Sequence, residues 1–468
     1  MCPGRRSESW CRYLCLLALF VLLNTAFQLL SLKLGFKRHL FSAEMLFALV
    51  LMTFGMRWLG AVAFAVSVAL ELSLGMVSVF FLFEPWQLVD MSEFLLEARP
   101  TYLALLIAAG LLVVAGTWLF FRVSSKIPWR PYGLGHVLIA LILLQAQWVL
   151  SQEQQTFFAP TLADREHLLF GSSAHLAREV MAINRGEVIG NGPDDAEYLP
   201  IQHASAVRTV WPQGLPKANR ILFVVAESWG QPKDPGVLQE QLKPIAGSSR
   251  VQGLSLTKVH ALGATAAAEL RELCGILPTR LNFRKLTASA VGDCLPRALA
   301  RSGYRTVGLH GAHGLMYRRL LWWPEIGLNE MLFREALPSN GSVCYSFPGF
   351  CDIELFSVIK QQLASERIFL YWLTLNSHVP YDRRDVTSYR ESLCQGVLGA
   401  TYPEQLCNYQ NLHVQFFEGL ARLIEDDSMA GVEVVVVGDH APVFNDGDTK
   451  IRFERNEVPL LHFIVAGR

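Results

Sequence analysis

Residues 432–440 read VEVVVVGDH, and this stretch decides the fold of the C-terminal half of the chain. Its run of valines is typical of a strand that is buried on both faces of a parallel sheet. Similar apolar runs lie at residues 221–226, 305–309, 368–375 and 460–465. Segments with helical spacing separate the runs, at residues 267–274, 295–302, 352–363 and 405–424. This alternation predicts an α/β domain over residues 219–468.

Polar side chains directly follow four of these runs. Glu227 follows the first run, Asp439 and His440 follow the valine run, and His310 and His378 follow two others. Ligands of such sheets bind beyond the carboxyl ends of the strands, so we expect these side chains to converge at one edge. Carboxylate and imidazole ligands suit one divalent ion, zinc or manganese. Each residue alone could equally be a cap or a loop hydrogen bond, so the hypothesis rests on their coincidence.

A hydroxyl completes this set. Thr265 lies between Gly263 and a run of good helix formers that includes Glu269, so we expect it at the start of a helix. It could be an ordinary cap. The same position would also place it where free N–H groups receive an anion, and a metal-bound hydroxyl there is an activated nucleophile. Ser228, beside Glu227, is the rival nucleophile.

The N-terminal third has a different composition. The chain has 468 residues and a formal net charge of zero, with 51% hydrophobic and 18% charged residues. This composition excludes disorder, and the neutral charge gives no reason to expect a nucleic-acid partner. Five stretches approach the ~20 apolar residues that span a bilayer. They are residues 13–32, 40–56, 58–83, 101–121 and 134–151, so residues 1–151 are predicted to be a transmembrane domain of five helices.

Basic residues indicate the orientation of these spans. Arginine and lysine at residues 5–12 and 122–130 predict cytoplasmic segments, and the acidic loop at 84–97 lies on the other side. The basic residues at 33–38 disagree with this assignment. With five spans, everything after residue 151 would lie outside. Residues 152–218 are interpreted as a juxtamembrane helix and linker.

The cysteines test this orientation independently. Three lie at the membrane end, and the other six are Cys274, Cys294, Cys344, Cys351, Cys394 and Cys407. An even number in an outer domain predicts disulfides, and pairing of sequence neighbours is the simplest of fifteen possibilities. Buried free thiols are the alternative.

The motifs together resemble a known family, the sulfatase-like membrane phosphotransferases of the alkaline phosphatase superfamily. This family includes lipoteichoic acid synthase and the phosphoethanolamine transferases. The motifs are Glu227-Ser228-Trp229, Gly263-Ala264-Thr265, Asn376-Ser377-His378-Val379-Pro380-Tyr381 and Gly438-Asp439-His440, in that order. The resemblance covers the whole chain. It implies five transmembrane helices before an extracytoplasmic α/β domain of the alkaline phosphatase/sulfatase type.

The resemblance also implies roles for particular residues. It implies one metal ion, held by Glu227, Thr265, Asp439 and His440, with Thr265 as the nucleophile. His378 matches a substrate-contacting histidine of the family. Arg319, in an aromatic–x–Arg motif that follows His310, matches the arginine that holds the donor phosphate.

The implied reaction moves phosphoethanolamine or phosphoglycerol from a phospholipid donor to an envelope glycan or glycolipid, on the outer side of a bacterial cytoplasmic membrane. Sulfatase activity is not expected, because Cys274 lies two residues too far from Pro278 for the sulfatase motif. Residues 441–444 lack the further histidine typical of phosphoethanolamine transferases. A phosphodiesterase, an inactive sensor or scaffold and, because Glu71 lies in a span, a transporter remain alternatives.

Overall fold

The computed structural model describes most of the C-terminal half and part of the N-terminal half of the chain. The described residues are 14, 18, 20–29, 42–79, 100–124, 142, 198–200, 205–261, 265–278, 286–338, 343–399, 401–444 and 447–467. The chain divides into two compact units, Met1–Val188 and Ile189–Arg468. Most of the fifth predicted span and the predicted juxtamembrane helix lie outside the described residues.

The first unit contains three long described helices, α2 (Ala43–Thr53), α3 (Arg57–Val79) and α5 (Pro100–Ser124). Phe64 of α3 stacks on Phe120 of α5, with ring centroids 4.2 Å apart. Glu71 is buried in this unit. None of the helices in the described ranges combines the length and the hydropathy of a membrane-crossing segment.

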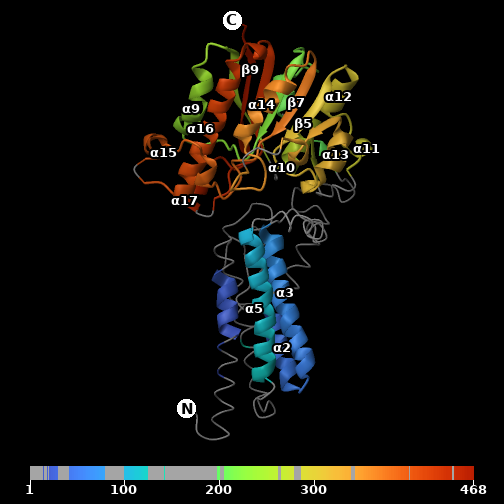
Figure 1. The fold of residues 1–468 in the computed structure, drawn as a ribbon, viewed down its shortest axis with the longest axis vertical. Coiled ribbons are helices and arrows are strands. Elements are labelled where there is room, and N and C mark those ends of the chain that lie inside the picture. The colour runs from blue at the N-terminus through green and yellow to red at the C-terminus, as the bar shows by residue number, and fades with distance from the viewer. Residues whose placement is uncertain are drawn as a thin grey trace. The chain divides into compact units, whose positions relative to one another are not determined.

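A seven-stranded sheet forms the centre of the second unit (Figure 1). Its order is β3-β9-β8-β2-β7-β5-β6, and β8, β2, β7, β5 and β6 are parallel whereas β9 is antiparallel to β8. The strands are β2 (Arg220–Ala226), β3 (Val251–His260), β5 (Arg305–His310), β6 (Glu330–Leu332), β7 (Ile368–Leu373), β8 (Val432–Gly438) and β9 (Glu457–Val465). The central strand β2 lies between β7 and β8, which supply the motifs containing His378 and His440.

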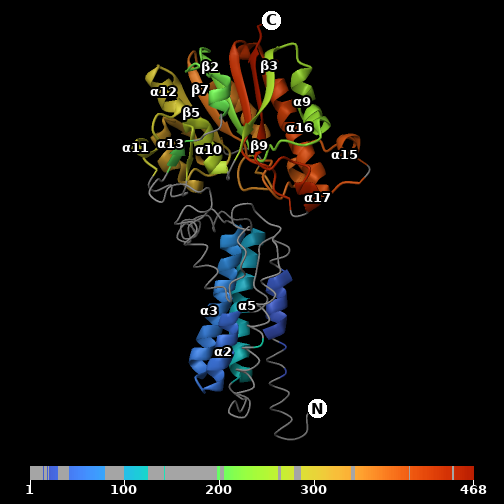
Figure 2. The same cartoon turned by 180° about the vertical axis from the view of Figure 1, so that it is seen from behind.

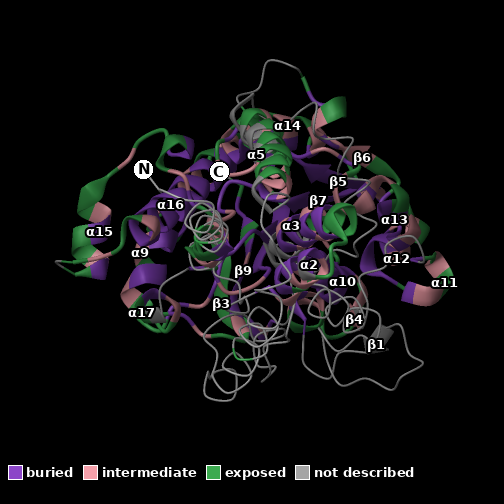
Figure 3. Ribbon diagram, turned by 90° about the horizontal axis from the view of Figure 1, so that it is seen from below, coloured by how far each residue is buried: buried purple, intermediate pink, exposed green. Residues whose placement is uncertain are grey.

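Helices cover both faces of this sheet, as the two opposite views show (Figures 1 and 2). One layer comprises α9 (Pro235–Ala246), α14 (Asp352–Gln362) and α16 (Glu404–Ile424). The other comprises α10 (Thr265–Cys274), α12 (Leu295–Arg301) and α13 (Arg319–Ile326). The core lies between these layers and the strands, whose residues are mostly buried (Figure 3).

Shorter elements connect these layers. They are β1 (Tyr198–Pro200), α8 (Ala206–Val210), β4 (Ile276–Pro278), α11 (Ala288–Val291), η2 (Met316–Arg318), η3 (Arg334–Ala336), η4 (Arg383–Asp385), α15 (Glu391–Leu398), η5 (Asp427–Met429) and α17 (Gly447–Lys450). Strands β1 and β4 pair in a separate two-stranded sheet.

The α/β prediction is confirmed, and so are the five predicted strands and four predicted helices, with small shifts at their ends. Strand β3 was not predicted because it lies at the edge of the sheet and exposes most of its side chains, so its sequence has no apolar run. Helices α9 and α13 were not predicted because each contains an internal proline, Pro244 or Pro324.

The predicted disulfides are also confirmed. Bonds join Cys274 to Cys294, Cys344 to Cys351 and Cys394 to Cys407. The first connects the end of α10 to the residue before α12. Because Thr265 is the first residue of α10, this bond helps to hold the helix that begins with the predicted nucleophile.

Candidate functional site

The predicted ligands converge because their strands are neighbours. Ala226, the last residue of β2, pairs with Gly438, the last residue of β8. Glu227 and Asp439 therefore leave the sheet side by side. One oxygen or nitrogen atom of each of Glu227, Asp439 and His440 lies within 4.8 Å of the others.

Thr265 reaches the same point from α10. Its hydroxyl donates a hydrogen bond to Oε2 of Glu227 at 3.1 Å. Two turns along the helix, Arg271 donates to the carbonyl oxygens of Gly438 and Asp439 at 3.2 and 3.1 Å. Arg271 thereby fastens α10 to the end of β8, which fixes the start of the helix relative to the two carboxylates.

One carboxylate oxygen in this cluster has no hydrogen-bond donor. Oδ1 of Asp439 accepts from the backbone N–H groups of Ser228 and His440, each at 2.7 Å. Oδ2 is buried and accepts no hydrogen bond within the described part of the chain. Buried polar atoms are nearly always paired, so an orphan carboxylate oxygen indicates a missing partner.

His440 is oriented toward this oxygen. Its Nδ1 lies 2.9 Å from the carbonyl oxygen of Ala441, a contact that fixes the ring and leaves Nε2 as the free ligand atom. Nε2 lies 3.3 Å from Oδ2 of Asp439 and 3.7 Å from Oε1 of Glu227. Two carboxylates and one imidazole thus face one another around a small volume.

The electrostatics of the cluster fit a bound cation. Burial, together with the nearby charge of Glu227, raises the pKa of Asp439 to about 7. Burial alone would lower the pKa of His440, but Asp439 and Glu227 raise it above its usual value. Two buried carboxylates repel each other, and a divalent ion would remove that cost while occupying the orphan oxygen.

Ser228, the rival nucleophile, is placed differently from Thr265. Its hydroxyl donates to Oε1 of Glu227 at 3.0 Å, but the residue is only 1% exposed, whereas Thr265 is partly exposed. Ser228 has a φ of 55°, a left-handed conformation that is rare outside glycine and clusters at functional sites. That turn directs its N–H to Asp439. The geometry therefore favours Thr265 as the hydroxyl open to a substrate.

His378 and His310 lie near the cluster as neutral groups. Burial lowers the pKa of His378, and the neighbouring His440 lowers it further. Burial also lowers the pKa of His310 far below its usual value, as does the charge of Arg319. Nδ1 of His310 lies 3.0 Å from the carbonyl oxygen of Leu373, so its ring is held at the end of β5 against β7.

Arg319 is held by a carboxylate that was not predicted. Its Nε and Nη2 donate to Oε2 of Glu269 at 3.1 and 3.0 Å. The other oxygen of Glu269 accepts from Nε1 of Trp323 and the hydroxyl of Tyr371 at 3.0 and 3.1 Å. Burial raises the pKa of Glu269, while Arg319 opposes that shift. Its position one turn after Thr265 was the available signal, because it places both side chains on one helix face.

Tyr317 is a second residue that contacts Arg319. The guanidinium of Arg319 lies 4.9 Å from the Tyr317 ring centroid. Burial raises the pKa of Tyr317 to about 12, and the charges of Glu227 and Asp439 contribute to the increase. The contact between ring and guanidinium thus joins the aromatic residue and the arginine of the predicted aromatic–x–Arg motif.

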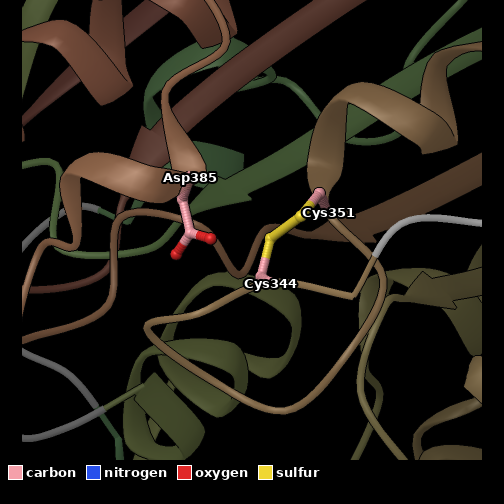
Figure 4. Close-up of side chains that lie close together, drawn as sticks. All are labelled: Cys344, Cys351 and Asp385. Carbon is pink, nitrogen blue, oxygen red and sulfur yellow. A yellow bond between two sulfur atoms is a disulfide. The ribbon is translucent and has the colours of Figure 1, made fainter.

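A second group of residues of metal-ligating types has its atoms engaged in bonds within the protein (Figure 4). The ligand-type atoms of Cys344, Cys351 and Asp385 also lie within 4.8 Å of one another, but the two sulfurs form a disulfide. The two oxygens of Asp385 accept from the backbone N–H groups of Tyr345 and Ser346 at 2.5 and 2.7 Å. Its ligand-type atoms are already engaged, so this group is structural.

A parallel sheet with a Glu–Asp–His cluster and a helix-start hydroxyl at its carboxyl edge defines an enzyme domain of the alkaline phosphatase type. A model of the Sulfatase family matches residues 219–460, just over half of the chain, so the chain belongs to the Sulfatase family.

Several solved structures are similar to this chain at low identity. A protein of the alkaline phosphatase superfamily from Vibrio parahaemolyticus has 15% identity and a TM-score of 0.39, over 54% of this chain and 61% of that one. The lipoteichoic acid synthase LtaP from Listeria monocytogenes has 16% identity and a TM-score of 0.39, over 57% and 72%. The C-terminal periplasmic domain of EcEptC from Escherichia coli, in complex with zinc, has 11% identity and a TM-score of 0.37, over 54% and 74%.

The match thus spans less than two thirds of the Vibrio parahaemolyticus protein. No curated protein sequence matches the chain.

Proposed function

We propose that the chain is a metal-dependent phosphotransferase with Thr265 as its nucleophile. The observation that carries this proposal is the orphan Oδ2 of Asp439, which faces His440 and Glu227 beside the Thr265 hydroxyl. A hydrolytic or transfer site needs both an activated hydroxyl and a stabiliser for phosphoryl charge, and this cluster offers positions for both.

Glu227, Thr265, Asp439 and His440 would hold one divalent ion, zinc or manganese, because carboxylate, hydroxyl and imidazole donors suit both. When bound, the ion lowers the pKa of a coordinated hydroxyl and neutralises phosphoryl oxygens. The features of this chain that fit such an ion are Oδ2 of Asp439, which accepts no hydrogen bond within the described residues, and Nε2 of His440, which faces both carboxylates.

In the proposed reaction, Oγ of Thr265 attacks the phosphorus of the donor. The Thr265–phosphorus bond forms as the bond to diacylglycerol oxygen breaks, and the Thr265 proton finishes on diacylglycerol. An acceptor hydroxyl then takes the phosphoryl group and restores the threonine. Arg319, the neutral His378 and the first N–H groups of α10 would stabilise the phosphoryl oxygens, while His310 would line the substrate site.

The proposal also specifies the donor, the acceptor and the location of the protein. The donor would be a phospholipid that carries phosphoethanolamine or phosphoglycerol, and the acceptor an envelope glycan or glycolipid. We propose that residues 1–151 form five membrane-spanning helices in a bacterial cytoplasmic membrane. Residues 152–218 would follow as a juxtamembrane helix and linker, and residues 219–468 would be the catalytic domain on the outer side. The long apolar stretches and the distribution of basic residues support this arrangement, and three disulfides suit an oxidising compartment.

Sulfatase activity is not proposed, despite the family name. Sulfatases need a free cysteine that is oxidised to an aldehyde, and the nearest candidate, Cys274, is bonded to Cys294. Thr265 occupies the helix start instead.

The test is a transfer assay on the full chain, reconstituted in vesicles with either phosphatidylethanolamine or phosphatidylglycerol labelled in the head group. We expect metal-dependent release of diacylglycerol and a label on Thr265, which an added glycolipid acceptor removes. Release of the label only into water, at an equal rate with and without acceptor, would identify a phosphodiesterase. No diacylglycerol from either lipid would contradict the proposed donors.

A further inference from the structure

A cavity of about 190 Å³ opens beside α15, outside the metal cluster. Its lining is mostly apolar, and the apolar wall comprises Pro232, Val237, Val397, Leu398, Leu406 and Phe453. An apolar cavity of about 150 Å³ in another protein stays dry and binds benzene, so this one has room for about six to eight carbon atoms.

The walls come from the same chain segments that supply the candidate active site. Pro232 follows the turn that begins at Glu227, after β2. Leu398 ends α15, in the connection that follows β7 and contains His378, and Phe453 follows β8 and Asp439. These wall residues therefore belong to segments that follow the carboxyl ends of the strands, as the residues of the cluster do.

An aromatic layer separates the cavity from the cluster. The Tyr409 hydroxyl accepts a hydrogen bond from the N–H of Gly230 at 3.2 Å, and its ring lies 5.4 Å from that of Tyr381. On its other side, Tyr409 lies 5.4 Å from Phe453 of the cavity wall. A ligand in the cavity would thus be a neighbour of the metal cluster without occupying it.

The cavity is preformed by covalent and backbone bonds. The Cys394–Cys407 disulfide joins α15 to α16, which supply Val397, Leu398 and Leu406. On the other wall, the N–H of Lys233 donates to the carbonyl oxygen of Arg452 at 2.8 Å. A rigid apolar cavity loses little entropy when it binds a ligand.

The rim carries two cations. Lys233 and Arg452 are exposed and line the cavity, and neither makes an ion pair with a carboxylate in the described part of the chain. The one acid of the lining, Asp234, caps α9 by accepting from the N–H of Gly236 at 2.8 Å. Ile451, beside Arg452, is 66% exposed. Nη1 of Arg452 donates to the carbonyl oxygen of Leu398 at 3.4 Å, which holds the guanidinium at the rim. Two cations without a carboxylate partner among the described residues, above an apolar cavity, complement an anion that carries a hydrocarbon chain.

We propose that this cavity binds a stretch of about six to eight carbons of one acyl chain of an anionic phospholipid from the bilayer surface, with the lipid phosphate held by Lys233 and Arg452. The lipid is distinct from the substrate, since its phosphate lies at the rim and not at the metal cluster. Its role is to dock the carboxyl edge of the sheet on the membrane, where the candidate active site would meet its substrates.

The test uses the full chain in phosphatidylcholine nanodiscs that contain a small fraction of a photoreactive phosphatidylglycerol, with a diazirine on its acyl chain. We expect the label in peptides that contain Val397, Leu406 or Phe453. The double variant Lys233→Ala/Arg452→Ala should lower this labelling about twenty-five-fold, from about fivefold per basic residue at an anionic membrane surface. Val397→Trp should fill the cavity and also prevent labelling.

The matched control is Lys217→Ala/Arg422→Ala, which removes two exposed cations near the amino ends of the strands and should leave the label unchanged. A diacylglycerol probe with the same diazirine should label the cavity weakly, because it lacks the phosphate. Absence of label from the cavity, equal labelling of the Lys233/Arg452 double variant, or equal labelling by the uncharged probe would each overturn the proposal. Because the readout is labelling, it does not depend on whether the chain transfers phosphoryl groups.

Discussion

Two groups of three ligand-type residues lie in the same domain, and only one has an unsatisfied atom. In the group of Cys344, Cys351 and Asp385, a disulfide and two backbone N–H donors occupy the ligand-type atoms (Figure 4). In the group of Glu227, Asp439 and His440, Oδ2 of Asp439 is buried without a hydrogen bond from the described residues.

In both groups the ligand-type atoms lie within 4.8 Å of one another, so proximity alone does not distinguish a metal site from a structural group. What differs is whether the protein itself satisfies the polar atoms. A buried carboxylate oxygen without a donor costs free energy, and a protein retains it where a ligand repays that cost.

The largest effect is expected for Thr265→Ala. Without the hydroxyl there is no covalent intermediate, so transfer should fall at least about a thousandfold, as expected for removal of a nucleophile. The measurement is diacylglycerol release by the full chain in vesicles. Thr265→Ser is the matched control, because it keeps a hydroxyl and should retain part of the activity. A phosphoryl group found on Ser228 would show that the nucleophile was assigned wrongly.

Glu269→Gln should have the next largest effect on activity. Glutamine keeps an acceptor for Arg319, but it removes the charge that fixes the guanidinium, so we expect transfer to fall about ten- to a hundredfold. Bound metal should stay at the wild-type amount, because the Glu269 carboxylate bonds to Arg319, Trp323 and Tyr371 and, among the described residues, to none of the four proposed ligands. Steady-state rates and metal analysis on the same preparation check both points. Unchanged rates would show that Arg319 needs no such support.

Asp385→Asn should change stability rather than chemistry. The new amide has one acceptor oxygen where the carboxylate had two, so one backbone N–H loses its partner at a cost of about 1–3 kcal/mol. Urea unfolding of the full chain measures this cost, with metal content as the control. A loss of metal on this substitution would contradict the assignment of this group as structural.

The sequence predicted the central sheet because its strands are continuous apolar runs, as at residues 432–437. Edge strand β3 could not be predicted, because most of its side chains are exposed and its sequence therefore lacks the continuous apolar run that marks the buried strands. Helix α13 was concealed by Pro324 and by the left-handed residues Tyr317 and Arg318 that precede it. Apolar patterning reports burial, so it fails where an element is exposed or begins after an irregular turn.

The functional site also contains residues that the sequence could predict and one whose role it could not. Glu227, Asp439 and His440 could be predicted together because each directly follows a strand, and neighbouring strands bring such residues to one edge. The role of Glu269 could not, because its partners Arg319 and Tyr371 are 50 and 102 residues away in the chain. The strand order that brings those partners together is a property of the packed sheet.

The central claim is that the group with the orphan oxygen binds metal and the other group does not. Elemental analysis of the purified full chain, of Asp439→Asn and of Asp385→Asn tests it directly, after dialysis against trace zinc and manganese. We expect about one zinc or manganese per chain in the wild type and in Asp385→Asn, and less than about a tenth of that in Asp439→Asn. Equal metal in Asp439→Asn and the wild type, or no metal in any of the three, would contradict the account.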